Sequence, residues 1–98
     1  MTKKIKENKI KGYEYIPLND NEHYFYSYDL GISAMLISVG FELISIDGQN
    51  PHKVLFIFKK KPDINNRVDE YFSDKVIVPA RSFFENIKML KNSIYNTF

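Results

Sequence analysis

Five consecutive apolar residues, Val54 to Phe58, stand between lysines in the segment KVLFIFKKK (53–61). Side chains of a strand alternate between the two faces of a sheet, so an unbroken apolar run places apolar groups on both faces. The run therefore predicts a central strand that is covered on both sides. Because the turn segment DGQNPH (47–52) separates it from the apolar segment FELISI (41–46), we expect these two segments to form an antiparallel hairpin.

The segment HYFYSYDL (23–30) alternates aromatic with other side chains and predicts a first strand over residues 23–28. Ser27 or Asp29 is placed to cap a helix that begins at once, since either oxygen accepts bonds from the free N–H groups of a first turn. That helix is apolar nearly all round and is expected to be largely buried. Gly40 predicts its end, because glycine takes the left-handed conformation without steric penalty.

Two further helices and a short strand are predicted in the second half of the chain. Pro62 ends the central strand, and Asp63 is placed to cap a helix whose apolar residues have helical spacing. These residues are Ile64, Val68, Tyr71 and Phe72. The sequence SDK ends this helix, VIV (76–78) predicts a short strand, and Pro79 suits the first turn of a last helix that runs to about residue 95. Its apolar stripe comprises Phe83, Phe84, Ile87, Leu90 and Ile94.

The order of these elements predicts an α+β fold with a small, mostly antiparallel sheet of three to four strands. The first six elements follow the ferredoxin-like β-α-β-β-α-β order, and a C-terminal helix is added. In that layout the first and third strands lie side by side, so the tyrosines of 24–28 and Phe56 and Phe58 are expected to meet on one face. Either this face is open and stacks a ligand, or the last helix covers it. We expect the helix to cover it at least in part, because aromatic residues at strand spacing are more often core.

Charge is distributed unevenly along the 98 residues. Residues 1–11 hold five lysines and one glutamate, a net charge of +4, whereas residues 12–98 hold nine basic and eleven acidic groups, a net charge of −2. We therefore expect a basic, partly disordered N-terminal arm over residues 1–22 and a single α+β domain over residues 23–98. The arm either contacts phosphates non-specifically or serves only solubility.

Composition excludes several classes of site and compartment. The chain has no cysteine, which rules out disulfides, thiolate zinc sites and cysteine nucleophiles. It has no apolar run of the roughly 18–20 residues that a membrane span needs, and its basic start is followed by polar residues and not by an apolar signal segment. We expect a soluble cytoplasmic protein that does not contact membranes.

Stacking of bases on two central strands is how the RNA-recognition fold uses this topology. The third strand, however, lacks the glycine of that fold's signature and carries bulky Leu55 and Ile57 in its place. Candidate nucleic-acid-binding residues are therefore drawn from the arm, the two strands, the lysines beside the third strand and the first turn of the last helix. They are Lys3, Lys4, Lys6, Lys9, Lys11, Tyr24, Tyr26, Tyr28, Lys53, Phe56, Phe58, Lys59, Lys60, Lys61 and Arg81.

No motif of the sequence identifies an enzyme, a cofactor or a metal. His23 and His52 stand outside any metal-ligand spacing. Asp69 and Glu70 are adjacent on a predicted helix, so their carboxylates point in different directions and do not converge. No phosphate-binding glycine loop and no nucleophile motif occurs. We therefore assign no catalytic residue, no metal ligand and no cofactor.

The stretch from Tyr26 to Tyr95 resembles a domain family of unknown function found in bacteria and their phages. The features that carry the resemblance are SYDLGISAMLISVGFELISI, VLFIFKK, VDEYFSD and VPARSFFENIKMLKNSIY. The family pattern has a polar capping residue where this chain has Pro79, which changes the start of the last helix but not the fold. The resemblance implies a phage or mobile-element origin and transfers no activity to any residue.

Two functions follow as expectations. The first is a small, non-enzymatic nucleic-acid-binding accessory protein that uses the lysine arm and the sheet aromatics. The alternative is a protein-interaction module, such as a phage-encoded modulator of a host protein or a structural subunit. Nucleic acid and a host or phage protein are thus the two partner classes, and the sequence leaves the oligomeric state open.

Overall fold

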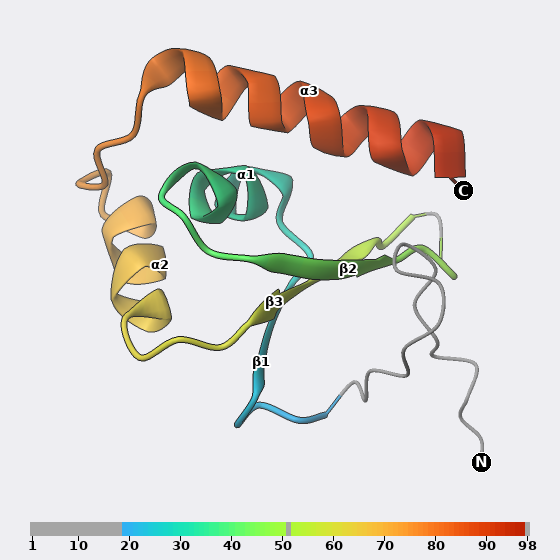
Figure 1. Ribbon diagram of the computed structural model, residues 1–98, viewed down its shortest axis with the longest axis horizontal. Helices are drawn as coiled ribbons and strands as arrows, with labels where there is room; N and C mark the ends of the chain where they lie inside the picture. The colour runs from blue at the N-terminus through green and yellow to red at the C-terminus, as the bar shows by residue number, and fades with distance from the viewer. Residues whose placement is uncertain (1–18, 51, 98) are drawn as a thin grey trace.

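The computed structural model describes residues 19–50 and 52–97, which form an α+β domain with a three-stranded sheet (Figure 1). The α+β class and the small antiparallel sheet predicted from the sequence are confirmed. In chain order the elements are β1 (Tyr24–Ser27), α1 (Leu30–Ser38), β2 (Leu43–Asp47), β3 (Leu55–Lys59), α2 (Ile64–Phe72) and α3 (Ala80–Thr97).

The sheet has the strand order β1-β3-β2, and both neighbours pair with β3 in the antiparallel sense. The continuous apolar run therefore does form the central strand, and β2 and β3 form the predicted hairpin. In the β1–β3 ladder Phe25 lies opposite Phe58, and Tyr26 lies opposite Ile57. The β2–β3 register shifts between Leu43 and Ser45.

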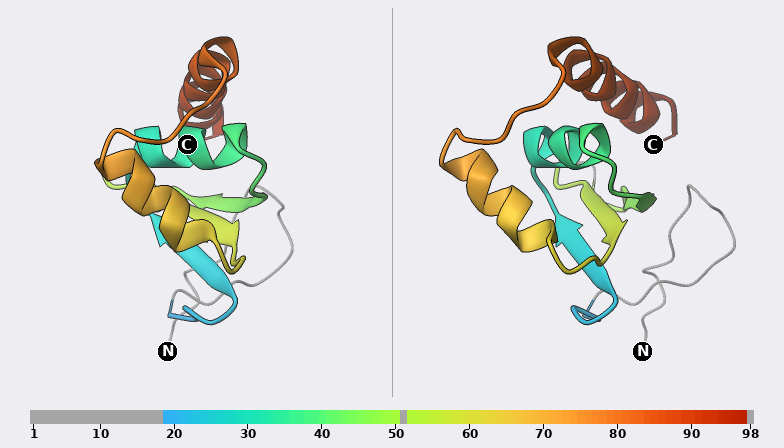
Figure 2. Two further views of the ribbon diagram at one scale, coloured as in Figure 1. Left: turned by 90° about the vertical axis from the view of Figure 1, so that its left-hand side faces the viewer. Right: turned by 60° about the vertical axis from the view of Figure 1, so that its left-hand side comes forward.

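All three helices lie on the same side of the sheet (Figure 2). Helix α1 lies against the sheet, α3 packs on the far side of α1, and α2 stands beside the end of α1 (Figures 1 and 2). Because α1 is the middle layer, it needs apolar side chains in nearly every direction. Residues Ile32 to Leu36 of α1 are all buried, as its apolar sequence predicted.

Both ends of α1 are formed by the residues that the sequence predicted. The Asp29 carboxylate accepts a hydrogen bond from the Ile32 N–H at 2.7 Å, and the Ser27 hydroxyl accepts one from the Asp29 N–H at 3.0 Å. Gly40 has a φ of +105°, and the N–H groups of Gly40 and Phe41 reach back to the carbonyls of Ile37 and Leu36. This paired pattern is the Schellman motif that ends many helices.

The predicted strand over residues 76–78 does not form. This segment connects α2 to α3 without a partner in the sheet, and only three strands occur in the described residues. The ferredoxin-like order requires a fourth strand beside β1 and is therefore not confirmed. Asp63 occupies the residue before α2, as predicted, but its side chain makes no capping hydrogen bond.

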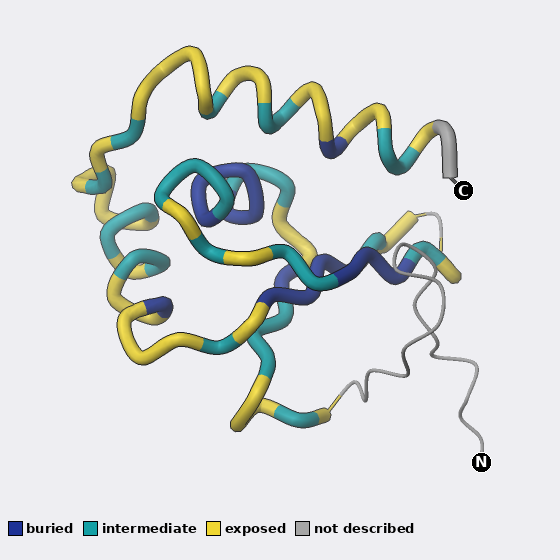
Figure 3. The backbone as a smooth tube through the Cα atoms, viewed as in Figure 1, coloured by how far each residue is buried: buried dark blue, intermediate teal, exposed yellow. Residues whose placement is uncertain are grey.

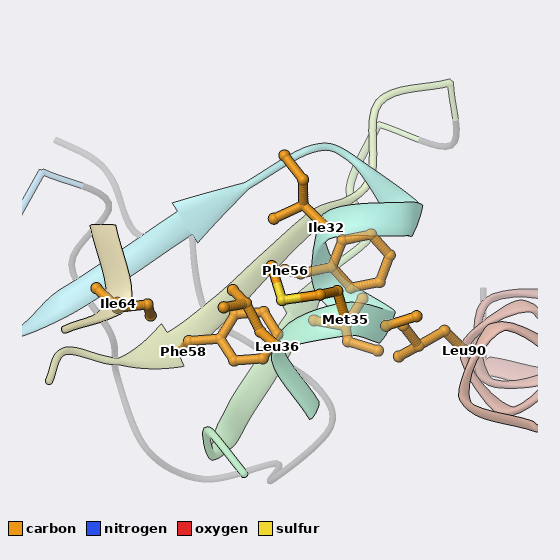
Figure 4. Packing of buried hydrophobic residues seen from close by; sticks show 9 residues of the cluster. Ile32, Met35, Leu36, Phe56, Phe58, Ile64 and Leu90 are labelled. Carbon is orange, nitrogen blue, oxygen red and sulfur yellow. The ribbon is translucent and has the colours of Figure 1, made fainter. Parts of the chain in front are cut away.

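The main core lies between β3, α1 and the inner sides of the other helices (Figure 4). Its fully buried residues come from five elements, and Leu90 is the fully buried residue that α3 contributes (Figure 4). A second apolar cluster lies on the opposite face of the sheet, where Leu55 and Ile57 pack with Tyr24, Tyr26 and Ile44. Among the described residues, no helix is both long and apolar enough to cross a membrane.

Candidate interaction surfaces

The aromatic residues expected to form one platform lie on opposite faces of the sheet. Phe56 and Phe58 point to the helical side and are buried in the main core, whereas Tyr24 and Tyr26 belong to the cluster on the other face. The prediction that they meet is wrong, and Phe56 and Phe58 have no exposed surface for a ligand. The helix that lies against their face of the sheet is α1, and α3 packs on α1 (Figure 1).

Tyr24 and Tyr26 lie on the face of the sheet that carries no helix (Figure 2). Their ring centroids are 6.3 Å apart, and both side chains are half-buried. The Tyr26 phenol oxygen accepts a hydrogen bond from the Asp20 N–H at 3.1 Å, and burial raises the pKa of this phenol above its usual value of 10.0. Lys59 lies opposite Tyr24 in the ladder, so a lysine shares this face with the two tyrosines.

Tyr28 lies beyond the end of β1 and is 57% exposed. The Lys53 ammonium lies 4.9 Å from the centroid of its ring, within the range of a cation–π contact. Tyr28 is thus separated from the tyrosine pair of β1 and has a basic partner of its own.

The remaining basic candidates have other partners or lie on other parts of the domain. The Lys60 ammonium donates to the Asn21 carbonyl at 3.1 Å, and Lys61 lines a hollow of about 380 Å³ that also contains Asp63 and Arg67. Arg81 is exposed in the first turn of α3, on the helical side. The five predicted arm lysines, Lys3 to Lys11, lie outside the described residues.

A polar cluster that the sequence did not predict precedes β1. Asp20, Glu22 and His23 each bring one potential ligand atom to within 4.8 Å of the others. The Asp20 carboxylate accepts hydrogen bonds from the N–H groups of Glu22 and His23 and lies 2.9 Å from His23 Nδ1. This hydrogen bond raises the pKa of His23 and lowers the pKa of Asp20. Only the close contact could have revealed the cluster, and exposed acidic groups of this kind are common without a metal.

An exposed apolar surface lies on the helical side of the molecule. Phe72 is 71% exposed, Ile77 is 91% exposed and Phe84 is 59% exposed. Met89 and Tyr95 add exposed apolar area along α3, where yellow marks exposed residues on its outer side (Figure 3). Such large apolar side chains in water are unfavourable unless a partner covers them.

Phe72 and Phe84 were predicted to belong to buried stripes, and the structure corrects both. Successive residues of a helix are about 100° apart, so Phe84 stands about 120° around α3 from the fully buried Leu90. Phe72 lies at the last position of α2, about 100° around the helix from Tyr71, which packs against the core. Helices α2 and α3 thus each carry more large apolar side chains than the face toward the core can bury, and the remaining ones are exposed.

A groove of about 490 Å³ lies next to this exposed surface, and we name it the α2–α3 groove. It is bounded by α1, the end of α2, the connection between α2 and α3, and the start of α3. Its lining is apolar apart from the Tyr71 hydroxyl and one charged residue, Asp74. The lining residues are Met35, Tyr71, Phe72, Asp74, Val76, Val78 and Phe83.

Comparison with known families decides the relationship of this chain. A family described as Domain of unknown function (DUF5659) matches residues 22–96. The chain belongs to this family. No curated protein and no solved structure matches it.

The DUF5659 match contains every helix and strand of the domain except the last residue of α3. It contains the tyrosine face and the α2–α3 groove, whereas all five lysines of the predicted arm precede it. The family description states no activity, so the exposed surfaces of this DUF5659 domain are the features that bear on its function.

Proposed function

We propose that this DUF5659 domain is a protein-interaction module that binds its partner through the exposed apolar surface beside the α2–α3 groove. The single observation that carries this proposal is the exposure of Phe72 and Ile77, at 71% and 91%. Phe72 lines the groove and Ile77 lies between two residues that line it. Apolar side chains gathered in this way are characteristic of partner sites, and buried aromatic anchors contribute much of the affinity at such sites.

The connection between α2 and α3 supports this proposal because its apolar residues alternate between half-buried and exposed positions. Val76 and Val78 line the groove and are half-buried, whereas Ile77 between them points away from the fold and is almost fully exposed. Removing a large apolar side chain from water is worth about 1.5–3 kcal/mol. The exposed Ile77 side chain contributes almost none of this free energy to folding, so burial of Ile77 by a partner can contribute it to binding.

The packing of the groove walls against the core favours the same function. Val76, Val78 and Phe83 are packed against the main core, so the surface does not have to be ordered when a partner binds. Pre-formed surfaces retain more of their contact energy as affinity, because less conformational entropy is lost.

Co-purification from the cells that naturally contain the protein tests this proposal. Full-length tagged wild type is compared with Phe72→Ala and with the control Tyr28→Ala, which truncates an exposed aromatic residue elsewhere. We expect a protein partner whose recovery falls at least about tenfold with Phe72→Ala, as for an interface anchor, and stays unchanged with Tyr28→Ala. Partners that are all insensitive to Phe72→Ala would contradict the proposal.

Nucleic-acid binding is a second candidate, and one observation favours it. Tyr24 and Lys59 lie opposite each other on the helix-free face of the sheet, with Tyr26 beside them. An aromatic ring next to a lysine suits a stacked base and its phosphate. The arm lysines would add phosphate contacts that weaken as salt is raised.

Binding of a fluorescent single-stranded oligonucleotide, measured at several salt concentrations, tests this second candidate. It predicts that affinity falls steeply with salt and that Tyr24→Ala weakens binding more than Phe84→Ala does. No binding at low salt, or equal effects of the two substitutions, would contradict it. For either candidate we propose a non-enzymatic accessory protein of phage origin that acts in the host cytoplasm. The sequence resemblance supports the phage origin, and the sequence motifs and composition support the other two properties.

A further inference from the structure

We infer that the α2–α3 groove binds a partner segment that combines an apolar anchor, aromatic or aliphatic, with a lysine or arginine. This inference rests on the proposed function and adds the chemistry of the partner. It is carried by the apolar composition of the groove lining, by the presence of exposed Asp74 in that lining and by the backbone conformation at Asp74.

The groove has the size and lining of a site for an apolar side chain. Its volume of about 490 Å³ falls within the range of about 300–1,000 Å³ that is usual for ligand pockets. Val76, Val78 and Phe83 form apolar walls, and Phe72 at the end of α2 adds an exposed aromatic edge. An apolar anchor inserted here would remove its own surface and that of Phe72 from water.

Asp74 is the one charged residue in this lining. Within the described part of the chain its carboxylate has no ion pair and no hydrogen bond. The last turn of α2, which also lines the groove, carries the negative end of the helix dipole. A cation next to the apolar anchor therefore matches both negative features, and a carboxylate in the partner would be repelled.

The backbone at Asp74 favours glycine over aspartate. Asp74 has a φ of +60° and is the non-glycine residue of the described chain with positive φ. It ends α2 with the same Schellman pattern in which Gly40 ends α1, since its N–H reaches the Tyr71 carbonyl and the Lys75 N–H reaches the Glu70 carbonyl. Glycine suits this position best, so what aspartate adds there is its carboxylate.

Selection from a displayed library of random twelve-residue peptides on the full-length protein tests the inference. Peptides selected on the wild type are then measured against Asp74→Asn, which removes the charge and keeps a residue that tolerates positive φ. Asp69→Asn is the matched control, because it removes an exposed charge of the same helix that does not line the groove. Asp74→Gly is the second variant, and we expect a raised melting temperature together with weakened binding.

The expected peptides pair aromatic or aliphatic residues with lysine or arginine. Their affinity falls on the order of tenfold with Asp74→Asn and with Asp74→Gly, falls also with Phe72→Ala, and is unchanged with Asp69→Asn. Peptides that need Phe72 but bind both Asp74 variants as well as the wild type overturn the basic partner and leave the proposed function standing. Peptides that bind Phe72→Ala as well as the wild type contradict the groove as a binding site, and both proposals then fail.

Discussion

The phenol oxygen of Tyr71 lies directly over Gly31, where a side chain would have no room. This contact joins α2 to the first turn of α1 and brings the Tyr71 hydroxyl close to the carboxylate that caps α1. Burial, and then the charge of Asp29, raise the pKa of Tyr71 above its usual value of 10.0. The close approach therefore favours glycine at position 31 and adds to the packing of α2 on α1, and Tyr71 also lines the α2–α3 groove.

Gly31→Ala tests this contact. A Cβ at position 31 would overlap the Tyr71 oxygen, so we expect the free energy of unfolding to fall by about 1 kcal/mol or more, as for other overpacked sites. Tyr71→Phe removes the oxygen and leaves the ring. The double variant should therefore lose less free energy of unfolding than the two single variants lose together. Urea unfolding of the wild type and the three variants measures this difference. Strictly additive effects would show that the contact does not constrain α2.

The cap of α1 makes a second prediction, with a matched control in the same chain. Asp29→Ala removes the carboxylate that accepts from the Ile32 N–H, and loss of such a cap lowers stability by about 1 kcal/mol. Asp63 occupies the equivalent position of α2 without a side-chain capping bond. We therefore expect Asp63→Ala to change the free energy of unfolding by less than about 0.5 kcal/mol. Equal effects of the two substitutions would contradict the capping assignment.

Docking of α3 on α1 depends on Leu90, which is fully buried. Leu90→Ala removes buried methyl groups and leaves a cavity, so we expect a loss of about 2–5 kcal/mol in the free energy of unfolding. Met89, its neighbour on α3, is 41% exposed, and Met89→Ala should lower stability by less than about 1 kcal/mol. Chemical denaturation of both variants checks this, and a Leu90→Ala protein as stable as the wild type would place α3 elsewhere.

The Asp20–His23 pair predicts a pH dependence. The hydrogen bond raises the pKa of His23 above 6.5, so its stabilising contribution is complete below pH 6.5 and is lost as pH rises through the raised pKa. The pKa of Asp20 is lowered from 3.8, so its contribution is present above pH 3.8 and is lost as pH falls through the lowered pKa. NMR titration of the His23 ring should show a downward shift of its pKa in Asp20→Asn. An unchanged His23 pKa would contradict the pair.

Local chemistry allowed much of the fold to be predicted from the sequence. Asp29 and Gly40 mark the ends of α1 because capping and positive φ depend on a few adjacent residues. The apolar sequence of β3 covers both of its faces, and the apolar sequence of α1 covers nearly its whole circumference. Such a sequence predicts that the element is buried on more than one side, whichever elements pack against it.

Features that depend on distant parts of the chain could not be predicted in this way. Alternation places Tyr24 and Tyr26 on one face of the sheet, and it places Phe56 and Phe58 together on one face. Whether these two faces are the same depends on how β1 and β3 are paired, and a shift of the pairing by one residue changes the answer. The register puts Phe25, and not the tyrosines, opposite Phe58. The segment 76–78 is apolar enough for a strand but has no partner in the sheet.

The exposure of the candidate surface residues also depends on distant parts of the chain. Helical spacing grouped Phe72 and Phe84 with the residues that face the core, yet a helix at the edge of a small domain buries only part of its apolar surface. Only the placement of α2 and α3 against α1 decides which residues remain exposed. The nucleic-acid candidates on the strands were divided for the same reason, since Phe56 and Phe58 became core and Tyr24 and Lys59 did not.

The most direct test of the central claim is photo-cross-linking in the cells that naturally contain the protein. A photoreactive phenylalanine analogue is placed at position 72, on the exposed apolar surface, or at position 65, an exposed residue of the same helix that does not line the groove. A covalent product reports the contact itself. The proposed function predicts a discrete cross-linked protein with the analogue at position 72 and none at position 65. No product at position 72, or the same products at both positions, would contradict it.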